Sequence, residues 1–388
     1  MMTTNYRKMR LKKDKDRSVA NYHPWLFSGA FEKSDREGIP GEVVEVYSND
    51  DSYIATGHYH PGTVMVRVLS FEQVLINDSF WKHRLEDAIA YRQQLATIDH
   101  SATNSFRLVH GEGDLLPGLI IDRYDGHLVI QTHSEGMALA VEVLAAALDS
   151  LMDPETIYYK IPGDLDKSKW LKGDAAETEI IENNCKFLVN WVEGQKTGFF
   201  IDQRDSRYLL GQYSKNKSVL NTFSYSGGFS VYALKAGATL VHSVDSSNKA
   251  IQWCDHNDNI NQPVDGTHAS FEKDVFSFLK SVITPYDIVV LDPPAFAKHR
   301  DSIKQAIKGY INLNFEALKK MESGSILFTF SCSQAISADD FKRSIFKAAI
   351  RAGKNLRIMH QIAQPADHPI SIYHPEGEYL KGLIVQIQ

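Results

Sequence analysis

Apolar and polar residues alternate along much of the first 75 residues. The stretches "GEVVEVYS", "YIATGHYH" and "TVMVRVLS" show this alternation, and Gly and Pro punctuate them at Pro40-Gly41 and Pro61-Gly62. A period of two residues is typical of strands with one buried face. Residues 1–75 are therefore predicted to form a small all-β domain.

Helical periodicity follows in "NDSFWKHRLEDAIAYRQQLATI". One face of this stretch carries the apolar residues Trp81, Leu85, Ala88, Ile89 and Leu95. Asn77 and Asp78 precede that face as candidate caps. A connecting helix is expected here.

The next region mixes strand and helix patterns. "GLIIDRYDGHLVIQTH" predicts a hairpin around Asp125-Gly126, and it is followed by a helix-like "GMALAVEVLAAALDSL" and a strand-like "ETIYYKI". "CKFLVNWVEGQKTGFFID" is predicted to be a second hairpin that turns at Glu193-Gly194. Residues 76–200 thus hold the connecting helix, a small α+β domain and a β-hairpin.

From residue 201 to 388, strands and helices alternate. The strand-like pieces are "SVLNTF", "TLVHSVD", "DIVVLD", "SILFTFS" and "LRIMHQIA", and helix-like segments separate them around residues 228–236, 247–260, 301–321 and 338–352. This alternation predicts a mostly parallel, doubly wound sheet. Ligands of such sheets bind at the carboxyl ends of the strands, near the switch in strand order.

Composition narrows the class of protein. A chain of 388 residues with 43% hydrophobic and 23% charged residues is expected to fold into two or three domains. No apolar run approaches the roughly 18 residues of a membrane span, and the N-terminal segment lacks the apolar stretch of a signal peptide. Three cysteines form no metal-like cluster and no even disulfide set. A cytoplasmic protein without a metal site is expected.

The net charge of −6 argues against a protein that binds nucleic acid over its whole surface. The segment "YRKMRLKKDKDR" is nevertheless locally basic. It could contact phosphates, or it could be a solvated strand or tail.

Candidate chemistry lies at the ends of the predicted strands. The first strand ends at Asn221 and enters "SYSGGFS", which is not the G-x-G-x-x-G fingerprint of dinucleotide-binding proteins. Gly227 and Gly228 would let backbone N–H groups approach a carboxylate or phosphate, although a tight turn without a ligand explains them too. Asp245 lies about 20 residues further on, where a ribose-binding acid is expected. Its alternative role is a helix cap.

Two acids and a cysteine follow the remaining strands. Asp274 could accept a hydrogen bond from an adenine amino group or cap the next helix. Asp292, in "DIVVLDPPAF", could orient a planar nitrogenous substrate, or the Asp-Pro-Pro loop could be structural. Cys332, in "FSCSQ", faces the same edge as a candidate nucleophile, although most free cysteines are buried packing residues. Cys185 and Cys254 lie away from this edge and are assigned to packing.

These motifs together resemble the class I S-adenosylmethionine-dependent methyltransferases. The closer resemblance is to the PUA-domain-containing 5-methylcytosine methyltransferases of large-subunit ribosomal RNA. It rests on stretches in order along the chain, among them "HPWLFSGA", "RLVHGEGDLLPGLIIDRY", "GQKTGFFIDQRDSR", "NTFSYSGGFSVYALKAGA", "LDPPAFAK" and "FSCSQ". The resemblance implies an N-terminal PUA domain, a small α+β middle domain and a C-terminal Rossmann-like methyltransferase domain.

The resemblance also implies a cofactor site for S-adenosylmethionine. Gly227 and its neighbours would hold the methionine portion, Asp245 the ribose and Asp274 the adenine. The full implied set is Lys196, Phe200, Asp202, Gln203, Asn221, Phe223, Tyr225, Gly227, Gly228, Phe229, Asp245, Ser246, Asp274, Val275 and Asp292. The implied partner is ribosomal RNA of the 23S type, with no membrane partner, and the oligomeric state stays open, a homodimer included.

The implied chemistry begins with the Cys332 thiolate adding to carbon 6 of cytosine, while Asp292 supports the ring nitrogen. Many RNA 5-methylcytosine enzymes carry a second cysteine after the motif Asp-Pro, whereas this chain has Pro294-Ala295-Phe296. The base that removes the carbon-5 proton is therefore unidentified. Phe296 could stack on the substrate base or pack internally. By the resemblance, "HPWLFSGA" and Arg67 could contact RNA, and an aromatic-rich PUA core explains Trp25 and Phe27 equally well.

Three other functions remain. A methyltransferase could act on a base nitrogen, in guanine or an exocyclic amine, and Cys332 would then be a bystander. An RNA-binding ribosome assembly factor could retain the fold without turnover, although the acids and the cysteine argue against it. A nicotinamide dehydrogenase ranks last, because the glycine fingerprint is missing.

Overall fold

The computed structural model describes residues 5–15, 21–283, 285–296 and 302–388. The chain divides into two compact units. The first comprises Met1–Thr178, Val189–Phe199 and Ala366–Gly377, and the second comprises Glu179–Leu188, Phe200–Pro365 and Glu378–Gln388.

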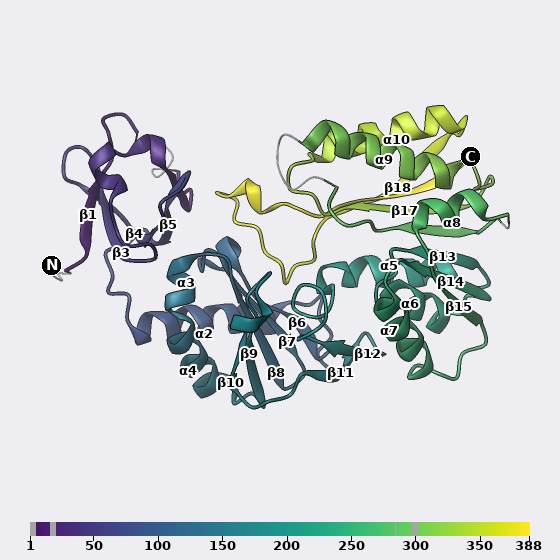
Figure 1. The fold of residues 1–388 in the computed structure, drawn as a ribbon, viewed down its shortest axis with the longest axis horizontal. Helices are drawn as coiled ribbons and strands as arrows, with labels where there is room; N and C mark the ends of the chain where they lie inside the picture. Colours follow the sequence, from purple (N-terminus) through teal and green to yellow (C-terminus); the bar gives the residue numbers. More distant parts are fainter. Residues whose placement is uncertain (1–4, 16–20, 284, 297–301) are drawn as a thin grey trace. The chain divides into compact units, whose positions relative to one another are not determined.

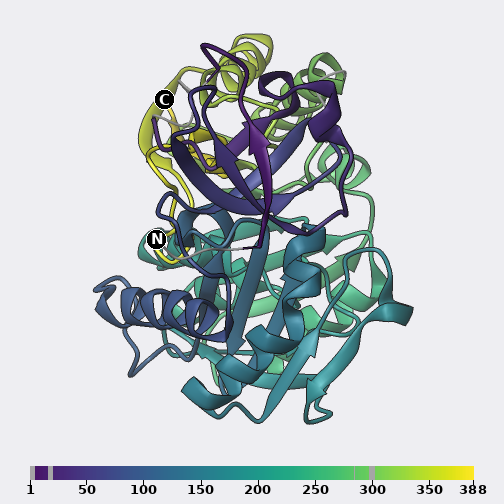
Figure 2. The same ribbon diagram turned by 90° about the vertical axis from the view of Figure 1, so that its left-hand side faces the viewer.

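The first unit begins with a five-stranded sheet in the order β1-β3-β4-β5-β2. Its strands are β1 (Arg7–Arg10), β2 (Trp25–Phe27), β3 (Val43–Tyr47), β4 (Tyr53–Tyr59) and β5 (Val64–Ser70). Figures 1 and 2 show these strands as a curved purple sheet. Its buried core includes Met9, Val46 and Met65. The predicted all-β domain is confirmed.

The basic N-terminal segment is part of this sheet. β1 pairs with β3 in parallel. Arg7 forms an ion pair with Glu42, and Arg10 forms one with Asp51. Arg7 and Arg10 of the basic segment are thus paired with acids of the same domain. Arg17 lies outside the described residues.

A second sheet has the order β10-β9-β8-β7-β6. Its strands are β6 (Ser105–His110), β7 (Leu119–Tyr124), β8 (His127–Thr132), β9 (Thr156–Tyr159) and β10 (Lys169–Lys172). β7 and β8 form the hairpin predicted at Asp125-Gly126. The helices α2 (Asp78–Gln94), α3 (Glu135–Leu139) and α4 (Val141–Met152) pack against the sheet. Asn77 caps α2, since its side chain accepts a hydrogen bond from Phe80 N.

A late part of the chain completes this unit. Ala366–Gly377 belongs to the first unit, although the residues on both sides of it belong to the second. The carbonyl oxygen of Asp367 accepts a hydrogen bond from the buried Arg92 at 2.8 Å, and its carboxylate accepts one from Arg107 N at 3.0 Å. The side chains of Asp367 and His368 are both inaccessible to solvent.

The second predicted hairpin differs from the structure. β11 (Glu177–Glu182) and β12 (Cys185–Asn190) pair with each other, so the turn lies at Asn183-Asn184. Both asparagines have a left-handed backbone, with φ of 47° and 63°. The predicted turn at Glu193-Gly194 is therefore wrong, and the residues after β12 continue into turns rather than a strand.

The second unit contains a seven-stranded sheet in the order β15-β14-β13-β16-β17-β19-β18. Its strands are β13 (Ser218–Thr222), β14 (Leu240–Asp245), β15 (Thr267–Glu272), β16 (Ile288–Leu291), β17 (Ile326–Ser331), β18 (Leu356–Ile362) and β19 (Lys381–Ile387). The first five in that order are parallel, and β19 runs antiparallel to its two neighbours, β17 and β18. The predicted doubly wound α/β fold is confirmed, and its strand order reverses between β13 and β16.

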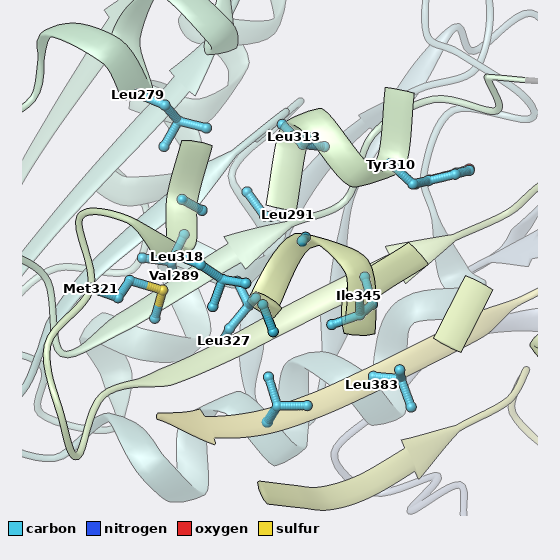
Figure 3. Close-up of a cluster of buried hydrophobic side chains, with 14 of the residues drawn as sticks. Leu279, Val289, Leu291, Tyr310, Leu313, Leu318, Met321, Leu327, Ile345 and Leu383 are labelled. Carbon is cyan, nitrogen blue, oxygen red and sulfur yellow. The ribbon is translucent and has the colours of Figure 1, made fainter. Parts of the chain in front are cut away.

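Helices cover both faces of this sheet. α5 (Arg204–Ser214), α6 (Gly228–Lys235) and α7 (Asn248–Asn259) lie on one face, and α8 (Val275–Ser281), α9 (Ile303–Leu318) and α10 (Ala338–Ala352) lie on the other (Figure 1). Figure 3 shows part of the core beneath α8, α9 and α10, where Leu291 and Leu327 meet Leu313 and Ile345. Among the described residues, no helix has the length and apolar character needed to cross a bilayer.

Candidate active site

The loop after β13 has a strained backbone. Phe223, Tyr225 and Gly227 all have positive φ, at 55°, 46° and 79°. This left-handed region is uncommon for residues with side chains, and strain of this kind clusters at functional sites. The loop follows β13, beside the reversal of strand order, which is where doubly wound sheets bind ligands.

The two adjacent glycines leave room for other parts of the protein. A Cβ atom on Gly227 would lie 2.6 Å from the sulfur of Cys254, and one on Gly228 would lie 3.0 Å from the Arg207 side chain. Packing against α7 and α5, together with the positive φ of Gly227, is sufficient to explain both glycines. Their role in holding a ligand remains a prediction.

The carboxylate of Asp245 is oriented by two backbone N–H groups. Tyr225 N donates to Oδ2 and Ser247 N to Oδ1, each at 2.9 Å. Ser247 is the cap of α7, because its hydroxyl accepts from Ala250 N. Each carboxylate oxygen can accept a further hydrogen bond. Asp245 therefore has capacity for a ligand diol, and the neighbouring Ser246 is exposed.

Phe200 is brought to the same loop. Its ring lies 5.2 Å from that of Tyr225, which lies 5.7 Å from the ring of Trp253. Arg207 donates to the carbonyl oxygen of Phe200 at 2.9 Å and forms a buried two-point ion pair with Glu182. The structure thus gathers Phe200, Tyr225 and Asp245, which come from distant parts of the sequence.

Asp202 and Gln203 are buried in the 3-10 turn η5 (Ile201–Gln203). Tyr379 donates a hydrogen bond from its hydroxyl to Asp202 at 2.8 Å, and its backbone N–H donates to Gln364 at 3.1 Å. Tyr379 was not predicted, and no local pattern marks it. It orients one of the predicted site residues.

Several buried oxygens at this edge have no hydrogen-bond partner within the part of the chain that the structure describes. They are Asn221 Oδ1, Gln203 Oε1, Ser224 Oγ and Ser226 Oγ. A buried acceptor without a partner is costly, so such atoms suggest a donor that arrives with a ligand. An amino acid ammonium group is a ligand of this kind.

The remaining predicted cofactor residues are placed differently. Asp274 is the cap of α8, since its Oδ1 accepts from Ser277 N and Ser277 Oγ, each at 2.9 Å. The side chains of Val275 and Phe229 are buried in the two cores of the sheet, so only their backbones are left for a ligand. Lys196 lies in the first unit, where its carbonyl oxygen accepts from Gln131.

Cys332 and Asp292 follow the neighbouring parallel strands β17 and β16. Both are half-buried, and Cys332 Sγ lies 3.9 Å from the carbonyl oxygen of Pro293. Burial raises the pKa of Tyr310 to about 12, and the negative charges of Cys332 and Asp292 act in the same direction. Tyr310 thus lies within electrostatic reach of both groups, and its hydroxyl accepts from Ser331 Oγ at 2.8 Å.

A buried lysine also belongs to this cluster. Lys381 stands opposite Ser331 in the pairing of β19 with β17, and its Nζ donates to the carbonyl oxygen of Ser333 at 2.6 Å. Burial lowers the pKa of Lys381, and the charges of Glu378 and Cys332 oppose that change. The predictions missed this cation, because nothing in the sequence shows which strand lies beside β17.

The other two cysteines are packing residues, as predicted. Cys185 and Cys254 are buried, and burial raises the pKa of each thiol to about 12. Phe296 packs against Tyr310, with 4.8 Å between the ring centroids. No group of acids, histidines and cysteines that could hold a metal ion occurs among the described residues.

The candidate RNA contacts of the first unit have protein partners. Glu112 accepts hydrogen bonds from Trp25 Nε1 at 2.7 Å and from Arg67 at 3.0 Å, and the Arg67 guanidinium lies over the Trp25 ring. Phe27 is partly exposed, at 39%. Trp25 and Arg67 are therefore explained by packing, while an RNA contact through them remains a prediction.

Two family models match the chain. The model for S-adenosylmethionine-dependent methyltransferases matches residues 158–375, and that for PUA-like domains matches residues 9–71. A solved structure of a proposed methyltransferase from Streptococcus mutans has a TM-score of 0.85 at 22% identity, covers 98% of this chain and 100% of its own, and so shares the fold. The chain belongs to the S-adenosylmethionine-dependent methyltransferases, and S-adenosylmethionine is its cofactor.

Two relatives match along almost their whole length and carry the name ribosomal RNA large subunit methyltransferase I. The protein from Tolumonas auensis is 39% identical over an alignment of 402 positions that covers 100% of both chains. The protein from Escherichia coli is 36% identical over 392 residues, which is 97% of this chain and 98% of its own.

The chemistry of the residues at the edge of the seven-stranded sheet is compatible with this cofactor. Asn221 Oδ1 and its neighbouring unpartnered oxygens suit the ammonium of the methionine portion, and the acceptors of Asp245 suit the ribose. The aromatic rings of Phe200 and Tyr225 suit the apolar parts of the ligand.

Proposed function

We propose that this chain forms 5-methylcytosine in large-subunit ribosomal RNA, with Cys332 as the nucleophile. Two kinds of observation support the proposal. The relatives that match the whole chain are named for large-subunit ribosomal RNA, and the chain carries a PUA-like domain. Within the methyltransferase unit, a half-buried cysteine and a half-buried acid follow adjacent strands at the edge that carries the candidate cofactor loop.

The chemistry begins at Cys332. Carbon 5 of cytosine is a poor nucleophile, because the ring electrons are delocalised. Addition of the thiolate to carbon 6 forms a sulfur–carbon bond and moves an electron pair to carbon 5, with Asp292 as a hydrogen-bonding or protonating group at the ring nitrogen. Carbon 5 would then form a bond to the methyl group that S-adenosylmethionine supplies when bound, and the sulfonium sulfur would keep the electron pair of the broken sulfur–methyl bond as a neutral thioether.

The last step restores the aromatic ring. A base removes the proton from carbon 5, the sulfur–carbon 6 bond breaks, and Cys332 leaves as a thiolate. The ammonium group of Lys381, which shares the Cys332 surroundings, favours the thiolate at the beginning and at the end of this sequence. A cytosine inside a helix cannot reach such a thiol, so an unstacked cytosine is the expected substrate.

The single observation that carries this function is the placement of Cys332. Its side chain is half-buried rather than sealed in the core, and it lies 3.9 Å from the carbonyl oxygen of the Pro that follows Asp292. Cys254 in the same unit is buried, and burial raises the pKa of its thiol to about 12. These contrasting environments make Cys332 the thiol that can take part in chemistry.

The experiment compares wild type, Cys332→Ala and Cys254→Ala on ribosomal RNA from cells that lack the gene. Mass spectrometry of the nucleosides should show 5-methylcytosine with wild type and Cys254→Ala, and a loss of at least about a thousandfold with Cys332→Ala, because a covalent nucleophile has no substitute. RNA that contains 5-fluorocytidine should trap wild type, but not Cys332→Ala, as a covalent complex.

Each rival function gives a different result. Methylation on a base nitrogen would appear as another methylated nucleoside and would survive Cys332→Ala. An assembly factor without turnover would bind S-adenosylmethionine weakly or not at all in calorimetry and would yield no methylated nucleoside. Either outcome would remove the proposal of thiolate catalysis.

A further inference from the structure

A chain of hydrogen bonds runs through the second unit from Asn221 to His268, which lies beside Asp258 on α7. Asn221 Nδ2 donates to Ser230 Oγ at 2.9 Å, and the hydroxyls of Ser230 and Ser243 are 2.7 Å apart. Ser243 Oγ lies 2.8 Å from His268 Nε2, and His268 Nδ1 lies 3.4 Å from Asp258 Oδ2. Asn221, Ser230 and Ser243 are buried to at least 99%.

Asp258, beside His268, determines which group donates and which accepts in each of these hydrogen bonds. The carboxylate of Asp258 lies beside Nδ1 of His268 and favours the proton on that nitrogen, which leaves Nε2 without a proton and therefore an acceptor. Ser243 then donates to Nε2 and accepts from Ser230. Because each hydroxyl has only one proton to donate, Ser230 must accept from Asn221.

This direction determines which end of the Asn221 amide faces away from the chain. The amide presents its NH2 group to Ser230, so Oδ1 is the atom left over. Oδ1 is one of the buried oxygens that have no partner within the described residues. The direction deduced from Asp258 and the position of the unpartnered oxygen agree.

We propose that Asp258 and His268 are positioning residues that keep Asn221 turned with its oxygen toward the ammonium group of S-adenosylmethionine. The proposal rests on the assignment of Asn221 to the methionine portion of the cofactor. An ammonium group can only donate hydrogen bonds, so it is held by an amide oxygen and repelled by an amide NH2 group. Neither positioning residue touches the cofactor.

Protonation of His268 reverses donor and acceptor in each of these hydrogen bonds. With both ring nitrogens protonated, Nε2–H donates to Ser243, Ser243 donates to Ser230, and Ser230 donates to Asn221, whose amide must then turn. Burial lowers the pKa of His268, whereas Asp258 and Asp255 raise it. The other titratable groups facing His268 are Cys254 on α7 and His242 on β14. The reversal is therefore expected below the ordinary histidine range.

The test uses two ligands that differ in the amino acid group. S-adenosylmethionine carries the ammonium, and 5′-methylthioadenosine lacks it. For the wild type, calorimetry should show that the affinity for S-adenosylmethionine is constant near neutral pH and falls about tenfold per pH unit once the pH is below the lowered pKa of His268. Methylthioadenosine should bind equally over the whole range, and the amino group of the cofactor stays charged throughout. Equal pH dependence for both ligands would overturn the proposal.

Variants separate the chain of hydrogen bonds from general stability. Ser243→Ala interrupts it, so S-adenosylmethionine should bind about tenfold more weakly at about pH 7.5, with no further loss at lower pH and unchanged methylthioadenosine binding. His242→Gln, which changes a neighbouring histidine outside the chain, should behave as wild type. A Ser243→Ala protein with wild-type affinity and pH dependence would overturn the proposal.

Nuclear magnetic resonance of the wild type gives a second reading that needs no variant. The nitrogen shifts of the His268 ring should report a proton on Nδ1 near neutral pH, and a proton on Nε2 instead would contradict the deduced direction. These measurements concern cofactor binding alone. Failure of cytosine methylation would leave them unaffected, whereas a wild type that binds no S-adenosylmethionine would contradict the cofactor assignment itself.

Discussion

Gly227 lies so close to Cys254 that a Cβ atom at this position would be 2.6 Å from the sulfur. The same glycine has a φ of 79°, which residues with side chains rarely adopt. We expect Gly227→Ala to lower the free energy of unfolding by about 2–4 kcal/mol, through backbone strain of about 1–2 kcal/mol and overpacking of a similar size. Urea unfolding monitored by circular dichroism measures it.

Two further variants identify the cause. Cys254→Ala combined with Gly227→Ala should recover the part of the loss that comes from the sulfur. Gly228→Ala should cost less, because its Cβ would meet the Arg207 side chain at 3.0 Å without a positive φ. Equal losses for Gly227→Ala and Gly228→Ala would show that the contact with Cys254 is unimportant.

The carboxylates of Asp245 and Asp274 already accept different hydrogen bonds from the protein. Asp245 accepts one backbone N–H group on each oxygen, whereas Oδ1 of Asp274 accepts two hydrogen bonds from Ser277. Asp245→Asn should weaken S-adenosylmethionine binding by about 10- to 100-fold, because a hydrogen bond to a charged acceptor contributes about 1.5–3 kcal/mol. Asp274→Ser keeps a side chain that can cap α8, so stability should change little, and the proposed adenine contact predicts binding about tenfold weaker. If calorimetry shows that Asp274→Ser binds S-adenosylmethionine with wild-type affinity, Asp274 acts only as a helix cap.

Lys381 offers a test of the thiolate. Lys381→Met removes the ammonium group near Cys332, and we expect methylation at neutral pH to fall by about 10- to 100-fold. Without that charge the thiolate forms only at higher pH, so the rate should recover partly as the pH rises. Lys381→Arg retains the charge and should retain the wild-type pH profile. A wild-type profile for Lys381→Met would exclude an electrostatic role.

Because of His58, we expect the protein to lose folding stability at acidic pH. It is buried against Trp81, and burial lowers its pKa from 6.5 to about 4. The unfolded state takes up the proton first, so the stability conferred by neutral His58 is complete above pH 6.5 and is lost as the pH falls towards about 4. The loss amounts to about 3 kcal/mol at most.

The comparison of wild type with His58→Gln isolates this contribution from those of the other histidines. Unfolding should be measured across this range for both proteins. The difference in stability between them should shrink as the pH falls, and a constant difference would mean that His58 is not responsible.

Strand ends were the most predictable part of the site. Apolar runs locate the strands of a doubly wound sheet, and the residues after each run must lie at one edge, so Asp245, Asp292 and Cys332 could be found in the sequence alone. The turn at Asp125-Gly126 was equally clear. The alternating residues of β12 fit a strand whichever neighbour it pairs with, and the turn was therefore placed on the wrong side of it.

The supporting residues could not be predicted. Lys381 reaches Ser333 only because β19 inserts between β17 and β18, and a linear pattern does not contain that pairing. His268 is an ordinary strand residue until the pairing of β15 with β14 brings its side chain within 2.8 Å of Ser243 Oγ. Tyr379 similarly depends on its distance in space from Asp202. These contacts arise from tertiary packing between elements far apart in the chain.

The placement of Ala366–Gly377 has a consequence for synthesis on the ribosome. The domain that emerges first cannot be finished until its last twelve-residue piece, carrying Asp367, has been translated and has left the exit tunnel. Until then Arg92 lacks the carbonyl oxygen of Asp367, and the nascent β-rich portion waits in an incomplete state. β19 (Lys381–Ile387) is made later still, so the sheet of the second unit is also completed only after this strand has been translated.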